Sequence, residues 1–252
     1  MDTSDPAEAH APAAEASKPV TAAEALKMLE EGNARWVAGA SEDPNTGTAR
    51  RGELAANGQH PFVTVLTCAD SRLPVERLFD RGVGDVFVAR VAGAVAADGE
   101  TGTIEYGVGH LHTPLLVVMG HTKCGAVAAA VAGVEVHGKV AGLIDAIEPA
   151  VARAKRNNAG VEGDALAAVA VKENVWQSMF DLLKHSPEIR GLVQKGELTV
   201  VGAVCDISTG KVEFMGEHPW QSELMAAMDG KGLHAEPGDT KAVTGVTDAA
   251  GH

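Results

Sequence analysis

Two short stretches of the sequence carry side chains that can bind a metal ion and act beside it. In the first, the apolar residues 62–66 are followed by Cys68, Asp70 and Arg72. The apolar run is short, rich in β-branched residues and preceded by Pro61, as in a buried strand of a parallel sheet. The thiol, the carboxylate and the guanidinium therefore follow the carboxyl end of a strand, where open α/β sheets bind their ligands.

The second stretch follows another apolar run, residues 114–120. His121 and Cys124 come directly after it and precede the alanine- and valine-rich residues 127–132, in the order of strand, tight turn and helix. Because these two side chains are three residues apart, they lie on one side of a first helical turn. If the two strands are neighbours, Cys68 meets them. Two thiolates and one imidazole suit a tetrahedral zinc ion and leave its fourth position open, which is typical of catalytic zinc sites.

Together the two motifs resemble those of the β-class carbonic anhydrases. That family has the pattern C-x-D-x-R and, roughly fifty residues later, H-x-x-C-G; this chain has Cys-Ala-Asp-Ser-Arg at residues 68–72 and His-Thr-Lys-Cys-Gly at residues 121–125. The resemblance extends from about residue 21 to residue 215. It implies an α/β fold with a central, mainly parallel β-sheet of about five strands flanked by helices. It also implies reversible hydration of carbon dioxide to bicarbonate and a proton, with one zinc ion per chain.

The expected mechanism uses zinc-bound hydroxide, which attacks the carbon of carbon dioxide. Asp70, paired with Arg72, would accept a hydrogen bond from that hydroxide and orient the attack. The alternative is an ion pair with only a structural role. In the family the aspartate can bind the zinc and close the site when the arginine pair is broken, so Arg72→Ala is expected to trap that state. Because two thiolates already neutralise the charge of the ion, we expect activity to rise toward alkaline pH.

Further site residues follow from the resemblance alone. The residues that match substrate-binding positions of the family are Gln59, Phe87, Ala92 and Tyr106. Of these, the glutamine would reach the active site of a partner subunit. Tyr106 and His110 are four residues apart on a helix predicted over residues 102–112 and could relay protons. Simpler alternatives remain: Gln59 as a loop cap, Phe87 as a core residue and His110 as a surface histidine without a role.

Composition limits the partners. The formal net charge of −13 and the isoelectric point near 5.2 argue against nucleic acids and anionic membranes. No run approaches the roughly 18 apolar residues of a membrane-spanning helix, so no membrane insertion is expected. The three cysteines form no disulfide framework, and Cys205 is expected to be buried and inert. The resemblance implies carbon dioxide and bicarbonate as ligands, and a homodimer or a dimer of dimers as the assembly.

The 252 residues are expected to form one domain with two tails. Residues 1–20 are predicted to be a disordered leader, residues 21–215 the zinc enzyme domain, and residues 216–252 a tail with a possible short helix at 221–228 followed by disorder. The leader as given lacks the basic and apolar segments of a signal peptide, so a cytoplasmic location is expected. A periplasmic location, after removal of an export signal absent from this chain, is the alternative.

Periodicity and capping signals place the remaining elements. Residues 21–24 have the form of a capping box and predict a helix that begins there. Further helices are predicted at residues 50–57, 73–80, 140–157 and 164–184 and after Ser186. Strands are predicted at residues 85–91, 197–206 and 211–215, the last two as a hairpin-like pair.

Three other functions compete with carbon dioxide hydration. Within the same fold, some relatives hydrolyse carbon disulfide or carbonyl sulfide. A zinc alcohol dehydrogenase shares the two-cysteine, one-histidine ligand set but needs a dinucleotide site, and the chain has no G-x-G-x-x-G after a predicted strand. A non-catalytic, zinc-stabilised protein would have a closed fourth position and no need for Arg72.

Overall fold

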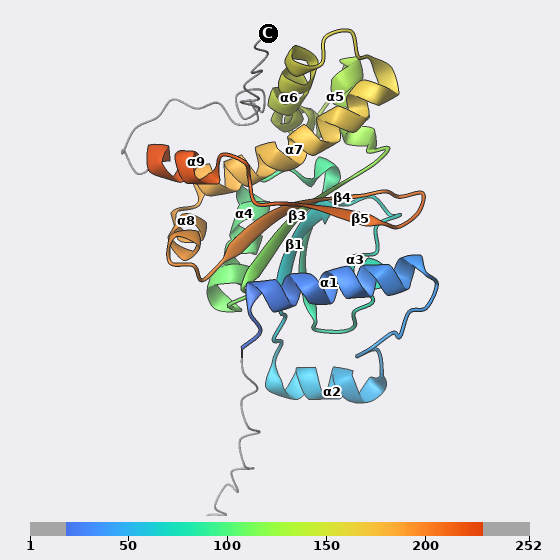
Figure 1. Cartoon of the computed structure of the whole chain (residues 1–252), viewed down its shortest axis with the longest axis vertical. Coiled ribbons are helices and arrows are strands. Elements are labelled where there is room, and N and C mark those ends of the chain that lie inside the picture. Colours follow the sequence, from blue (N-terminus) through green and yellow to red (C-terminus); the bar gives the residue numbers. More distant parts are fainter. Residues whose placement is uncertain (1–18, 229–252) are drawn as a thin grey trace, which may run out of the picture.

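The computed structural model describes residues 19–228 and has an α/β architecture (Figure 1). Five strands form one sheet in the order β2-β1-β3-β4-β5. Neighbouring strands are parallel except β4 and β5, which are antiparallel. This confirms the predicted, mainly parallel sheet and its terminal hairpin. The strand bounds are β1 Val63–Cys68, β2 Val86–Val91, β3 Leu115–His121, β4 Thr199–Cys205 and β5 Val212–Gly216.

Helices cover both faces of the sheet. In Figure 1, α5, α6 and α7 lie on one side and α1 and α2 on the other. A 3-10 turn η1 (Ala92–Ala94) and a π-helical turn η2 (Tyr106–His110) interrupt the connections. The helix bounds are α1 Ala22–Val37, α2 Thr48–Asn57, α3 Val75–Leu78, α4 Asp98–Glu105, α5 Gly125–Ala132, α6 Val140–Asn157, α7 Gly163–His185, α8 Pro187–Gln194 and α9 Gln221–Met228.

The two central strands form the rigid centre of the molecule. Every residue of β1 and β3 is buried, as expected for parallel strands covered on both faces. Helix α7 packs directly on β3, where a Cβ on Gly120 would come within 2.9 Å of Val175 Cγ2 and 3.1 Å of Val171 Cγ1. Glycine at this position therefore lets the helix approach the sheet closely, next to the carboxyl end of β3.

The predicted helix over residues 102–112 is wrong in its bounds and its type. The α-helix begins earlier, at Asp98, ends at Glu105, and continues as the π-helical turn η2. Gly107 lies against β1, where an added Cβ would be 2.4 Å from Thr64 Oγ1. The Thr113 hydroxyl also donates a hydrogen bond of 3.2 Å to the Gly107 carbonyl. This contact with the strand, which local periodicity does not encode, accompanies the widened turn.

The helix predicted at residues 73–80 is also shorter than expected. It spans only Val75–Leu78, and Pro74 is its N-cap instead of lying in its first turn. The chain leaves the helix at Asp80, which has a φ of 47° and whose carboxylate binds Arg35 Nε at 2.6 Å. A buried ion pair to helix α1 therefore ends this helix early.

The remaining predictions concern the domain organisation, and the described residues cover only part of it. The capping box is present, since the side chains and backbone of Thr21 and Glu24 bond reciprocally, and α9 matches the short helix predicted at residues 221–228. The proposed disorder of residues 1–18 and 229–252 lies outside the described residues, so the domain bounds stay predictions. Within residues 19–228, no helix combines the length and apolarity needed to cross a bilayer.

Candidate metal centre

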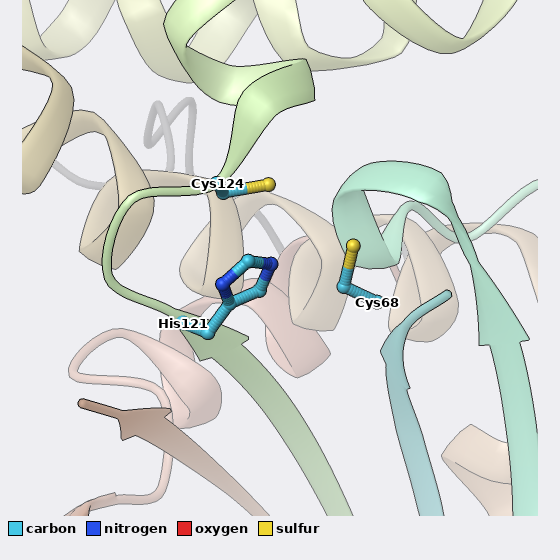
Figure 2. A group of neighbouring side chains, drawn as sticks. All are labelled: Cys68, His121 and Cys124. Atoms are coloured by element: carbon cyan, nitrogen blue, oxygen red, sulfur yellow. The ribbon is translucent and has the colours of Figure 1, made fainter. Parts of the chain in front are cut away.

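The three predicted ligands converge at the carboxyl ends of β1 and β3. Cys68 is the last residue of β1, His121 is the last residue of β3, and Cys124 caps the N-terminus of α5. Because β1 and β3 pair in parallel, their carboxyl ends are neighbours. The two sulfurs and an imidazole nitrogen all lie within 4.8 Å of one another, and all three side chains are buried. Figure 2 shows them pointing toward a common point from three segments of backbone.

The imidazole of His121 is held in the tautomer that a metal requires. Its Nδ1 lies 2.9 Å from the Thr122 carbonyl oxygen, and because a carbonyl only accepts, Nδ1 carries the hydrogen. The other nitrogen, Nε2, is buried and has no hydrogen-bond partner among the described residues. A buried, unpartnered nitrogen lone pair beside two sulfurs fits a metal ion, and the carbonyl contact is a common means of orienting such a ligand.

The two thiols share one proton in the protein without a metal. The hydrogen bond from Cys124 lowers the pKa of Cys68 to about 4, against the opposing effect of burial; His121 and the Gly93 N–H also favour the thiolate. The same hydrogen bond, together with burial, raises the pKa of Cys124. A divalent cation would replace the shared proton and bind both thiolates. Two sulfurs and one nitrogen fit zinc with one position left for water.

Asp70 and Arg72 form a two-pronged ion pair at the edge of this cluster. Arg72 Nε lies 2.9 Å from Asp70 Oδ1, and Arg72 Nη2 lies 2.7 Å from Asp70 Oδ2. The Arg72 backbone N–H also donates to the carboxylate. The guanidinium holds the pKa of Asp70 well below its usual range, so this carboxylate is ionised at neutral pH. Its Oδ2 lies 3.9 Å from His121 Nε2, which places a fixed acceptor beside the metal position.

Similarity to known proteins agrees with this geometry. Residues 63–212 match the family model of carbonic anhydrases. The chain is 37% identical over 193 residues to carbonic anhydrase 2 of Mycobacterium tuberculosis, which covers 74% of this chain and 89% of that protein. It is 38% identical over 203 residues to the carbonic anhydrase of Mycolicibacterium smegmatis, with 79% and 94% of the two chains covered.

Solved structures identify the class. The β-carbonic anhydrase CafA of Aspergillus fumigatus is 27% identical with a TM-score of 0.63, over 81% of this chain and 96% of that one. The Coccomyxa β-carbonic anhydrase, solved with acetazolamide, is 27% identical with a TM-score of 0.61, over 75% and 86%. The chain belongs to the β-carbonic anhydrase family. A β-carbonic anhydrase of Sordaria macrospora, from a study of two described as tetrameric, shares the fold at 24% identity and a TM-score of 0.60, over 76% of this chain and 96% of that one.

In this β-carbonic anhydrase the carboxyl end of the sheet carries the ligand motifs, and two further residues brace them through contacts that the sequence alone did not reveal. Arg90 donates from Nε to the Cys68 carbonyl at 3.2 Å and from Nη2 to the Asp70 carbonyl at 2.7 Å. The Gly93 N–H donates to Cys68 Sγ at 3.4 Å. The run Ala-Gly-Ala at residues 92–94 was a signal that something approaches closely there, and a lone arginine in a strand was a signal of a buried partner.

The structure divides the predicted substrate residues of this β-carbonic anhydrase into two groups. Ala92 directly precedes Gly93, which lines the cavity at the metal centre, and its role toward substrate stays a prediction. Phe87 pairs in register with Thr64, whereas Val91 pairs with Cys68. Four residues of strand correspond to about 13 Å, so Phe87 lies toward the opposite end of the sheet.

Three more of the predicted site residues accompany Phe87. The ring of Tyr106 lies 5.9 Å from that of Phe87 and 5.3 Å from that of His110, and Tyr106 is 48% exposed. Gln59 is exposed in the loop before β1, again at the amino end of the strands. We call Gln59, Phe87, Tyr106 and His110 the amino-end group. Within one chain this group is apart from the metal centre, and its predicted roles stay predictions.

Proposed function

We propose that this protein catalyses the reversible hydration of carbon dioxide to bicarbonate and a proton at one zinc ion per chain, held by Cys68, His121 and Cys124. The observation that carries the proposal is the buried cluster of three donor atoms within 4.8 Å, one of them an imidazole nitrogen left without a partner in the described part of the chain. Carbon dioxide hydration is the general reaction of the family that the chain belongs to.

The protein's own groups would orient the reaction. Zinc bound at the cluster would supply the Lewis acidity that makes water nucleophilic near neutral pH. Asp70 is ionised and can only accept hydrogen bonds. It can therefore accept a hydrogen bond from an attacking water and fix the orientation of that water. Because Arg72 engages both carboxylate oxygens, Asp70 is held away from the role of a fourth ligand.

The ligand set also sets the expected pH dependence. Two thiolates neutralise the double charge of a zinc ion, so water at the site is acidified less than at a site with three neutral histidines. We therefore expect hydration to rise from pH 7 to pH 9.

A second copy of the chain would complete the site. Phe87 is about 13 Å along the strand from the residue beside Cys68, and the other three members of the amino-end group are exposed, so the group does not line the metal cavity of its own chain. We propose that Gln59, Phe87 and Tyr106 serve the metal centre of a partner subunit, with Tyr106 and His110 as a proton route. The smallest active form would then be a homodimer, and a dimer of dimers would preserve the arrangement.

The decisive experiment measures hydration and metal content together. Stopped-flow carbon dioxide hydration is recorded at pH 7 and pH 9 on protein with determined zinc content, alongside Cys68→Ser. The matched control is Cys205→Ser, because Cys205 is also buried and pairs in register with His121 but is not part of the cluster. We expect rapid hydration with one zinc per chain, lost in the first variant and kept in the control.

Two results would overturn the proposal. Full zinc content without hydration at either pH, but with hydrolysis of carbonyl sulfide or carbon disulfide, would assign the chain to a sulfur-analogue hydrolase. Full zinc content without turnover of any of these substrates would indicate a structural zinc site. In that case Asp70→Asn would change neither the zinc content nor the folding.

A further inference from the structure

Helix α7 contributes one polar side chain to the wall of the metal centre. Asn174 is 3% exposed and follows Val171 by one helical turn, on the face that packs against the sheet. It lines a cavity of about 10 Å³ together with Cys68, His121 and Cys124. This cavity is as small as a single water, so the residue directly borders the ligand atoms.

Asn174 connects α7 to one of the ligands through the turn η1. Its Nδ2 donates a hydrogen bond of 2.7 Å to the Gly93 carbonyl oxygen. The N–H of the same glycine donates to Cys68 Sγ at 3.4 Å. One turn further along the helix, the Ser178 hydroxyl donates to the Ala94 carbonyl at 2.9 Å. Two neighbouring carbonyls of η1 are therefore held by two buried side chains of one helix, but only Gly93 also contacts a sulfur.

The turn that Asn174 holds has an unfavourable backbone. Gly93 has a φ of 81° and is followed by Ala94 with a φ of 54°, a left-handed value that costs energy for a residue with a Cβ. A Cβ on Gly93 would also lie 2.7 Å from Ile147 Cδ1. Such a conformation persists only where the surroundings impose it. The Asn174 hydrogen bond acts on Gly93 itself, whereas that of Ser178 acts on the next residue.

The second polar atom of Asn174 indicates that packing alone does not explain the residue. Its Oδ1 is buried and has no hydrogen-bond partner within residues 19–228. A buried, unpaired amide oxygen is destabilising, and leucine would fill a similar volume without that cost. The position therefore retains an amide for its donor, which the Gly93 carbonyl accepts.

We propose that Asn174 is a positioning residue of the metal centre, which holds Gly93 so that its backbone N–H points at the sulfur of Cys68. This inference rests on the proposed function, since it assigns a role toward the bound metal. A hydrogen bond to a thiolate withdraws charge from the sulfur and fixes its direction, and groups that orient metal ligands in this way commonly set metal affinity.

The test uses Asn174→Leu, with Ser178→Ala as the matched control that removes the neighbouring hydrogen bond from the same helix to the same turn. Each variant is loaded with cobalt(II), whose thiolate charge-transfer bands report the electron density on sulfur. We expect Asn174→Leu to shift these bands to longer wavelength, because a sulfur without its hydrogen bond gives up an electron more easily. We also expect zinc release to a chelator to be about 10-fold faster in Asn174→Leu than in the parent. In Ser178→Ala the rate of release should stay within about twofold of the parent.

Each outcome separates this inference from the proposed function. A parent protein that shows no cobalt–thiolate bands would overturn the proposed metal site itself. Parent-like bands and zinc release in Asn174→Leu would overturn the role of Asn174 alone. Equal changes in Ser178→Ala would also overturn it, because they would show a general need for the turn. If circular dichroism shows that Asn174→Leu does not fold, Asn174→Ser, which removes the same bond with a smaller side chain, gives the same readings.

Discussion

The two ends of strands β1 and β2 differ in how complete their chemistry is within one chain. At the carboxyl ends, three buried donor atoms, a clamped carboxylate and their supporting hydrogen bonds all come from the same chain. At the amino ends, the aromatic rings of Phe87 and Tyr106 touch each other, but Tyr106 and Gln59 are exposed. The set of metal-binding side chains at the carboxyl ends is complete within one chain, whereas the side chains of Tyr106 and Gln59 at the amino ends are exposed.

This difference indicates what each set of residues requires. Metal ligands must leave water and be fixed before the metal binds, so they follow rigid strands that the fold buries on both faces. Exposed side chains of the amino-end group gain a fixed position only when another surface covers them. The metal centre is thus a property of the fold, whereas the proposed substrate cavity would be a property of the assembly.

The largest effect that would test this comparison comes from Arg72→Ala. Removing the guanidinium frees Asp70 and lets its pKa rise toward the ordinary range, so we expect hydration to fall about 100-fold with zinc content unchanged. A crystal structure of the variant is expected to show Asp70 as the fourth zinc ligand. Water retained at that position would contradict this expectation.

The chain offers a matched control for that variant. Arg77 pairs with Asp43 at the same 2.7 Å, and its side chain is 53% exposed, as that of Arg72 is. Exposed ion pairs contribute little to stability, and neither residue of this pair lines the cavity at the metal centre. We expect Arg77→Ala to hydrate carbon dioxide at the parent rate. An equal loss in both variants would mean that the effect comes from surface charge in general.

A mixing experiment gives the next largest effect and tests the division into two ends directly. Gln59→Ala is expected to reduce hydration about 10-fold with zinc content unchanged, since it would remove one substrate contact. In a mixed dimer, one chain carries Gln59→Ala and the other carries Cys68→Ser. The intact metal centre of the Gln59→Ala chain would then meet the intact Gln59 of the Cys68→Ser chain. The rate per zinc should therefore recover when excess Cys68→Ser is exchanged into Gln59→Ala.

The control for mixing uses a double variant. Cys68→Ser combined with Gln59→Ala has no intact glutamine to offer, so its addition should leave the rate per zinc unchanged. Recovery with the double variant, or none with the single one, would show that Gln59 acts within its own chain or not at all.

A smaller effect, on stability, separates loss of activity in acid from loss of the fold. His218 is buried against the ring of Trp176, and burial, with a smaller contribution from Arg153, lowers its pKa to about 4 from 6.5. Above pH 6.5 both folded and unfolded chains hold a neutral imidazole. As pH falls below 6.5, His218 takes up a proton in the unfolded chain but stays neutral in the folded chain. The free energy of unfolding should therefore fall by about 2 kcal/mol by pH 5.

Urea unfolding at pH 7.5 and pH 5 in the parent and in His218→Gln measures this effect. The variant should lack the part of the pH dependence that His218 causes. Glu173 and Asp181, whose pKa values burial raises, act in the opposite direction but are present in both proteins and cancel in the difference. The same change in stability with pH in both proteins would assign the acid sensitivity to other groups.

The sequence was sufficient for the parts of the molecule that local patterns encode. Short apolar runs ending in polar motifs gave β1 and β3 and predicted which side chains would meet at their ends. Parallel pairing of neighbouring strands then brought Cys68, His121 and Cys124 together, as the structure confirms. Spacing and strand chemistry were enough here because each ligand either ends a buried strand or closely follows one.

Features that depend on contacts distant in sequence could not be predicted. The π-helical turn η2 accompanies contact between Gly107 and Thr64, and helix α3 is cut short by the ion pair of Asp80 with Arg35. Asn174 is separated from its partner Gly93 by 81 positions. A polar residue on the buried face of α7 was the available signal, but no local rule says which carbonyl it meets.

The order of the strands has a consequence for how the protein acquires its metal. Strand β1 lies between β2 and β3, so the chain must leave β1, form β2 on one side, and return across the sheet to form β3 on the other. Parallel pairing over such separations forms late and slowly in folding. Cys68 and His121 become neighbours only after that pairing is made. Loading of zinc therefore follows assembly of the central sheet instead of nucleating it, and a chain that stalls before β3 docks carries no metal centre.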